Sequence, residues 1–335
     1  MFVIGAGASF ELGLPLGTTL LEEIGSSLNY TEDHFGRSGD ADRRIYRELE
    51  LEAQQRQVNV GDYMRAAWRV RDAAHLGLSI DNVIHQQNDD PLFAWCGKLA
   101  IAQRILTAES KSSLRLHDNQ RRITWPEVRG TWLGGFAQLL VQDVEKKNVA
   151  GIFDNVSVVS FNYDRTRKRF LPFALSSQFA LSNRGAEELT SKLRVFHPYG
   201  SLGSLPWEGR VEPVEFGCQR CSLASVAKNI LTFTEGVEDD ENLDDMKSTI
   251  SKAKRVVFLG FGYLAQNMEL ISRNVDGQAE QVLGTSFGLS DPDQELVKNQ
   301  LSFLFHERRR SYKDAQLSPK KCAAFIRENF RTLTS

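Results

Sequence analysis

Four short segments carry the residue types that could do chemistry, and each of them follows an apolar stretch. In chain order they contain Gly5-Ala6-Gly7-Ala8-Ser9, then Asn162 and Asp164, then His197, then Gly260 and Gly262. Glycines let backbone approach a ligand closely, a neutral amide both donates and accepts hydrogen bonds, and an imidazole titrates near neutral pH. These types suit the binding of a phosphate-bearing ligand with proton transfer beside it.

The glycine-rich run stands between an apolar stretch at 2–4 and a helix-like stretch. A strand, a tight turn and a helix in this order bring backbone amides and the positive end of a helix dipole towards a phosphate. The dinucleotide fingerprint would place a third glycine where Phe10 stands, and no acidic residue ends a clear second strand about 20 residues on. The sequence therefore argues against an ordinary hydride-transfer enzyme.

Short apolar runs bounded by glycine, asparagine or charged residues predict buried strands. They occur at 2–4, 156–161, 195–197, 256–260 and 281–284, with helix-like stretches such as 165–174 and 267–273 between them. Such alternation predicts an α/β protein with a Rossmann-like open parallel sheet. In these sheets ligands bind at the carboxyl ends of the strands, where all four segments would lie.

The stretch from about residue 29 to 147 has apolar residues at helical spacing and few strand-like runs, so it predicts a mostly helical insertion. Trp125-Pro126 is expected to open one of its helices. We therefore expect a Rossmann-like domain formed by 1–28 and 150–290, a helical insertion domain at 29–149, and C-terminal helices at 291–335.

Composition bounds the function. The 335 residues carry a formal net charge of −2, which argues against a surface that coats nucleic acid, and no apolar run is long enough to span a membrane. A cytoplasmic protein is expected. Among the four cysteines, Cys218 and Cys221 form a CxxC pair; packing cysteines are favoured over a zinc site because a closed site needs four ligands, so no metal is expected.

Structural roles compete with each functional interpretation. Asn162 and Asp164 could simply end a strand and cap the helix that starts near Arg165, and a lone histidine such as His197 is more often structural than catalytic. The four segments together, however, resemble the sirtuin-like family. The resemblance rests on Gly-Ala-Gly-x-Ser with Gly13-Leu14-Pro15 behind it, on Phe-Asn-Tyr-Asp at 161–164, on Tyr-Gly-Ser-Leu-Gly at 199–203 and on Gly-Phe-Gly-Tyr at 260–263.

More closely, the chain resembles sirtuin-like NAD-consuming proteins of bacterial anti-phage systems. The resemblance implies NAD as the substrate, cleaved to nicotinamide and ADP-ribose. It places the diphosphate on Gly5, Ala6, Gly7, Ala8 and Ser9 and the adenosine ribose beside Gly260 and Gly262. Asn162 would orient a water or ribose hydroxyl, His197 would accept its proton, and Asp164 would hold the carboxamide or support the loop. It also implies assembly into a homo-oligomer or a partner such as a HerA-type ATPase or an Argonaute-like protein.

The sequence departs from sirtuins at three points. Leu16-Gly17-Thr18 replaces the Asp-Phe-Arg of the deacylases, and the four-cysteine zinc module is missing, which makes a protein deacylase the weaker alternative. Sirtuins also carry histidine directly before Gly-Ser, whereas here Tyr199 fills that position and His197 lies two residues earlier. We therefore predict an NAD glycohydrolase with His197 as base, and keep open Tyr199 at that position and a module that binds NAD or ADP-ribose without catalysis.

Overall fold

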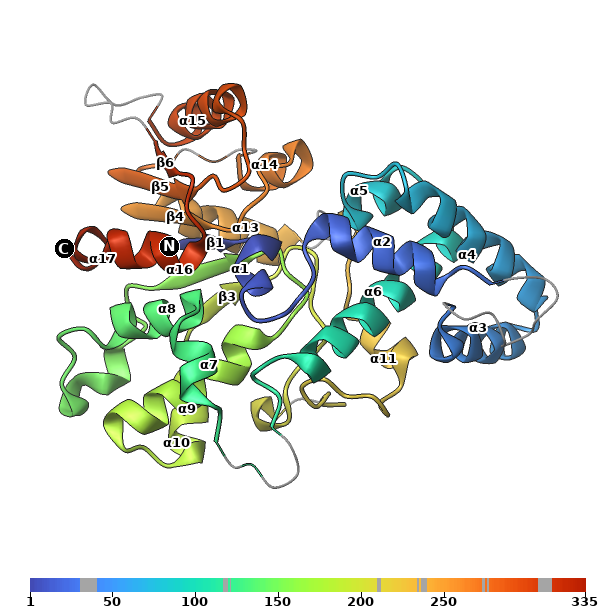
Figure 1. Cartoon of the computed structure of the whole chain (residues 1–335), viewed down its shortest axis with the longest axis horizontal. Coiled ribbons are helices and arrows are strands. Elements are labelled where there is room, and N and C mark those ends of the chain that lie inside the picture. Colours follow the sequence, from blue (N-terminus) through green and yellow to red (C-terminus); the bar gives the residue numbers. More distant parts are fainter. Residues whose placement is uncertain are drawn as a thin grey trace. The chain divides into compact units, whose positions relative to one another are not determined.

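The computed structural model describes residues 1–30, 41–116, 120, 122–209, 212–233, 235, 240–272, 275, 277–306 and 315–335 (Figure 1). The chain divides into two compact units. The first combines Met1–Gly13, Ser112–Pro198 and Asp239–Ser335, and the second combines Leu14–Lys111 and Tyr199–Glu238. The chain thus leaves the first unit twice and returns to it twice.

The first unit contains a six-stranded, all-parallel sheet in the order β3-β2-β1-β4-β5-β6 (Figure 1). The strands are β1 Phe2–Ile4, β2 Ser157–Ser160, β3 Arg194–Phe196, β4 Arg255–Leu259, β5 Gln281–Thr285 and β6 Gln316–Ser318. This order is that of the Rossmann fold, so the α/β fold with an open parallel sheet is confirmed. The first strand is central, and its residue Val3 pairs with Val159 of β2 and with Phe258 of β4.

Helices connect the parallel strands, because such strands need crossover connections. The helices of the first unit are α1 Ala6–Phe10, α7 Trp125–Arg129, α8 Trp132–Val141, the 3-10 helix η1 Lys146–Gly151, α9 Thr166–Phe179, α10 Asn183–Thr190, α13 Asp240–Ser251, α14 Ala265–Ser272, α15 Asp291–His306, α16 Cys322–Glu328 and α17 Phe330–Thr334. Glu11, just after α1, links helices α8 and α16 to the glycine-rich turn. Its carboxylate accepts the N–H of Trp132 in α8 at 2.7 Å and the N–H of Ala323 in α16 at 3.0 Å.

The second unit is helical, with α2 Gly17–Ser27, α3 Arg43–Arg56, α4 Val60–Ala74, α5 Ile80–His85, α6 Pro91–Lys111, the 3-10 helix η2 Pro206–Glu208 and α11 Leu223–Ala227. Helix α6 is buried on nearly all sides, and this central place explains why it is apolar around most of its circumference. Asp90 accepts the N–H groups of Leu92 and Phe93 and so caps the start of α6.

The limits of the two units differ from the boundaries expected from the sequence. Helices α7 and α8 fall in the first unit, where Phe136 of α8 packs edge-on against Phe2 of β1 with ring centroids 5.0 Å apart. Residues 199–238 fall in the second unit, where Lys98 of α6 pairs with Glu235. The described residues of the stretch 29–149 are mostly helical, as predicted, and Trp125 begins α7.

The sequence interpretation of 291–335 as helices alone is wrong, because β6 lies within it. This strand is three residues long, polar at both ends and paired on one side only, so it lacks the apolar run of a buried strand. In the described part of the chain, no helix combines the length and the apolar character that crossing a membrane requires.

Candidate functional site

The glycines after β1 are explained first by packing of backbone on backbone. Gly5 donates its N–H to Leu259 O at 3.0 Å, and Gly7 donates to Gly260 O at 2.9 Å. A Cβ on Gly5 would lie 2.6 Å from Gly260 O, and one on Gly260, whose φ is +57°, would lie 2.0 Å from the nitrogen of Ala8. Only glycine allows the turn to pack against the end of β4 in this way.

This packing uses amides that the sequence assigned to a phosphate. The N–H groups of Gly5 and Gly7 donate to β4 and the residue after it, and that of Ala8 donates to Gly5 O at 3.0 Å. A phosphate at this turn would therefore be bound by other groups. Gly262 differs from Gly260, because it is exposed and only the side chain of Leu264 lies within 4 Å of its added Cβ.

Asn162 lies just beyond the end of β2 and is tied to the glycine-rich turn. Its Nδ2 donates to Gly5 O at 2.9 Å and to Ser9 Oγ at 2.8 Å. Because a backbone oxygen can only accept, the contact with Gly5 fixes which side-chain atom is the nitrogen. Both amide hydrogens thus have acceptors, and these two contacts fix the direction in which the carbonyl oxygen Oδ1 points.

Ser9 and Asp164 complete this buried network. The Ser9 hydroxyl donates to Asp164 Oδ2 at 2.6 Å while it accepts from Asn162. The other carboxylate oxygen, Oδ1, accepts from Thr166 N at 3.0 Å and from Thr166 Oγ1 at 2.5 Å. Asp164, which precedes the N-cap residue Arg165, therefore binds the first residue of helix α9, a structural role close to the cap weighed from the sequence, and it also holds Ser9 in place.

Positive charge is buried beside this network. Arg167, in the first turn of α9, is 5% exposed, and burial lowers the pKa of its guanidinium to about 10, against the opposing effect of Asp164. The carboxylate of Asp164 is thus the counter-charge that helps Arg167 to remain cationic.

His197 follows β3 directly, on the same edge of the sheet as Asn162. Both ring nitrogens are buried, and neither has a hydrogen-bond partner among the described residues, although the residue as a whole is partly exposed. Burial holds the pKa of the imidazole well below its usual value, Arg167 and Lys168 lower it further, and the adjacent backbone of Asn162 opposes them. The ring is therefore neutral at physiological pH and lies beside the backbone of Asn162.

The pKa of Tyr199 is shifted in the opposite direction from that of His197. It belongs to the second unit, is 1% exposed, and has its pKa raised first by burial and then by Asp81. Its phenol stays protonated at neutral pH, so Tyr199 is unsuited to accept a proton. Of the two residues between which the sequence left the base position open, His197 has the protonation state that a base requires.

Two threonines belong to this edge of the sheet but were not identified from the sequence. Thr285, at the end of β5, accepts the N–H of Gly260 at 2.8 Å, and Thr166 binds Asp164 as described. The pattern Asp164-x-Thr166 is a recognisable helix-start signal and could have been found. Thr285 gave no signal, because a threonine that ends a strand has no distinguishing pattern.

Replacing Ser9 with alanine is expected to destabilise the protein by about 2 to 3 kcal/mol, because it leaves a buried oxygen of Asp164 without a donor and an N–H of Asn162 without an acceptor. Urea unfolding followed by circular dichroism measures the change. The matched control is Ser191→Ala, which removes an exposed hydroxyl in the same unit. A loss for Ser9→Ala no larger than for the control would contradict the network.

No group of three or more His, Cys, Asp or Glu side chains that could share a metal ion occurs among the described residues. No model of a known protein family matches this chain, and a search of curated proteins finds no match either.

Proposed function

We propose that the first unit is an NAD glycohydrolase, which cleaves NAD to nicotinamide and ADP-ribose. One observation carries the proposal: a neutral imidazole with buried ring nitrogens, His197, lies beside the backbone of Asn162 at the carboxyl edge of a sheet with Rossmann strand order. Ligands of open α/β sheets bind at this edge. The resemblance of the four motifs to sirtuin-like proteins supports NAD as the substrate.

Cleavage of the bond between ribose and nicotinamide does not need a strong general acid. In NAD the nicotinamide already leaves from a cationic ring, so the site has to stabilise an oxocarbenium-like ribose and deliver water to it. A neutral amide and a neutral base meet both needs without adding positive charge next to the developing cation. Asn162 and His197 supply these two groups.

Asn162 serves as the orienting group. Because Gly5 O and Ser9 Oγ hold both hydrogens of its amide nitrogen, the side chain cannot rotate without losing two hydrogen bonds. Its Oδ1 then accepts from a ribose hydroxyl or the attacking water in a fixed direction. Asp164 acts one step further away, by orienting Ser9, rather than by holding the carboxamide.

His197 serves as the base that removes a proton from that hydroxyl or water. The depressed pKa keeps its ring unprotonated, so the imidazole is in the form that can accept a proton. The diphosphate lies at the turn of residues 5–9 through groups other than the three amides already used, and the adenosine ribose lies next to Gly262.

A second candidate function is a module that binds NAD or ADP-ribose intact. The burial of both ring nitrogens of His197 favours it, because a base that activates water must contact that water. Under the hydrolase proposal, binding of the substrate or assembly of the protein would have to expose a ring nitrogen of His197 to the attacking water.

We propose further that the hydrolase is an effector of bacterial anti-phage defence, controlled by self-assembly or by a partner such as a HerA-type ATPase or an Argonaute-like protein. The support is the resemblance of the motifs alone.

Purified protein incubated with NAD, alone and with any co-encoded partner, tests the proposal through the nicotinamide released. We expect release in at least one of these conditions. Tight binding of NAD without release in any of them would favour the binding module, and neither binding nor release would reject both functions.

A further inference from the structure

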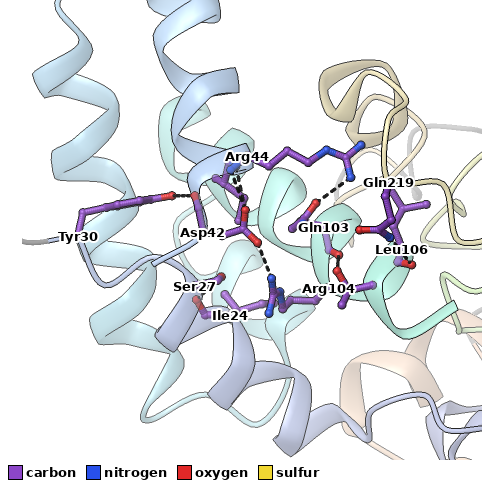
Figure 2. Close-up of polar contacts among 11 residues, drawn as sticks. Ile24, Ser27, Tyr30, Asp42, Arg44, Gln103, Arg104, Leu106 and Gln219 are labelled. Carbon is purple, nitrogen blue, oxygen red and sulfur yellow. Dashed lines mark hydrogen bonds and ion pairs between the residues drawn. The ribbon is translucent and has the colours of Figure 1, made fainter. Parts of the chain in front are cut away.

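The CxxC pair, Cys218 and Cys221, belongs to a loop of the second unit that is fastened to helix α6. Before the pair, Gly217 donates its N–H to the buried carboxylate of Glu109 at 2.9 Å. Within it, the amide of Gln219 donates to Leu106 O at 3.2 Å, and Figure 2 shows these two residues side by side. The loop therefore has a defined position on α6.

Arg44 of helix α3 fastens the other side of the loop. Its Nη2 donates to Cys221 O at 2.6 Å and lies 3.5 Å from Cys221 Sγ. Its Nη1 donates to Gln103 Oε1 at 3.1 Å, as Figure 2 shows. The start of α3 is itself fixed, since Asp42 accepts from the backbone of Arg44 and pairs with Arg104. The loop is thus held between two helices.

The two thiols are close and have different surroundings. Cys221 donates its backbone N–H to Cys218 Sγ at 3.0 Å, and its own Sγ lies 3.6 Å from Cys218 O. Because Cys218 Sγ accepts this backbone hydrogen bond and is partly exposed, we assign Cys218 as the attacking sulfur. Burial and a hydrogen bond to Cys218 raise the pKa of Cys221 to about 11, with Arg44 acting against them, so Cys221 stays a thiol.

The other cysteines provide a contrast within the same chain. Cys96 and Cys322 are buried, and burial raises the pKa of both thiols, that of Cys322 to about 12. Cys218 and Cys221 are partly exposed. A reagent in solution can therefore distinguish the CxxC pair from the two buried thiols.

We propose that Cys218 and Cys221 form a redox-active dithiol, which a low-molecular-weight disulfide oxidises to an intramolecular disulfide. The Cys218 thiolate attacks one sulfur of the reagent, forms a mixed disulfide and releases one thiolate. Cys221 then loses its proton and attacks the Cys218 sulfur, which releases the second thiolate. Two protein thiols and one disulfide give one protein disulfide and two small thiols. The proposal is independent of NAD chemistry.

Reduced protein incubated with oxidised glutathione tests the proposal, with thiols counted by alkylation and located by peptide mass spectrometry. We expect the four free thiols to fall to two, with Cys218 and Cys221 linked and Cys96 and Cys322 unreacted in the same sample. Four remaining thiols, or oxidation spread over all cysteines of the folded protein, would overturn it. The wild-type measurement requires no substitution, so a variant that fails to fold does not affect it.

Single substitutions test the order of the two steps. Cys221→Ser should accumulate glutathione on Cys218, because the resolving thiol is missing. Cys218→Ser should react at least about 10-fold more slowly, since it retains only the protonated thiol. Glutathione trapped mainly on Cys221 in the wild type or in Cys218→Ser would contradict the assignment of Cys218 as nucleophile.

Discussion

Replacing Asn162 with alanine is expected to lower the rate of NAD cleavage by roughly 100- to 1,000-fold, the effect seen when one preorganised polar group at a reacting centre is removed. The alanine removes Oδ1, which we assign to the ribose hydroxyl or the water. It also removes the two hydrogen bonds that tie β2 to the glycine-rich turn. Nicotinamide release under saturating NAD measures the loss.

Two further variants separate chemistry from folding. Asn183→Ala removes an exposed asparagine of the same unit and should keep full activity. Asn162→Asp keeps the shape but places a carboxylate against Gly5 O, which only accepts, so it should lose most activity as well. Activity in Asn162→Ala equal to that in Asn183→Ala, with both proteins folded, would remove Asn162 from the mechanism.

Replacing His197 with alanine is expected to lower cleavage by roughly 100-fold or more, because general-base catalysis contributes about that much. NAD affinity should change far less, since the base acts on the water or hydroxyl and not on the bound dinucleotide. The control is His75→Ala, an exposed histidine at the end of α4. Equal losses in turnover and in affinity would indicate a binding role for His197.

The pH dependence distinguishes His197 from an ordinary exposed histidine. Its folded-state pKa is depressed by burial, so the base remains active through pH 6.5 and activity falls only at lower pH. Stability behaves differently. The unfolded chain takes up this proton below about pH 6.5 while the folded protein does not, so stability declines as pH falls through that value, by at most about 1.4 kcal/mol per pH unit. The stability of His197→Gln should therefore fall less steeply than that of the wild type as the pH is lowered through this value, because glutamine does not titrate.

Much of the sheet could be predicted from the sequence, because parallel strands that are buried on both faces consist of continuous apolar runs. The runs at 156–161 and 256–260 correspond to β2 and β4. The strand β6 could not be found, since Gln316–Ser318 owes its conformation to pairing with β5 rather than to its own residues. Tertiary pairing decides such short edges.

The candidate site was predicted as a set of residue types, and the structure adds the contacts that divide their roles. Asn162, Ser9 and Asp164 form one network, which the spacing of the motifs alone does not reveal. The glycines at 5, 7 and 260 were assigned to a ligand, yet close backbone packing accounts for them. A glycine in the sequence indicates that another group packs closely against the backbone, but it does not indicate whether that group is a ligand or another part of the chain.

The most direct test of the account follows both products of one reaction. Protein in excess over NAD labelled in the nicotinamide ring is quenched over time, and free nicotinamide and ADP-ribose are separated and quantified for the wild type and for Asn162→Ala. The account predicts equal amounts of the two products from the wild type, in the assembled or partner-bound state if that state is required, and nearly none from the variant. Label that remains in intact NAD bound to folded, assembled wild-type protein would contradict it.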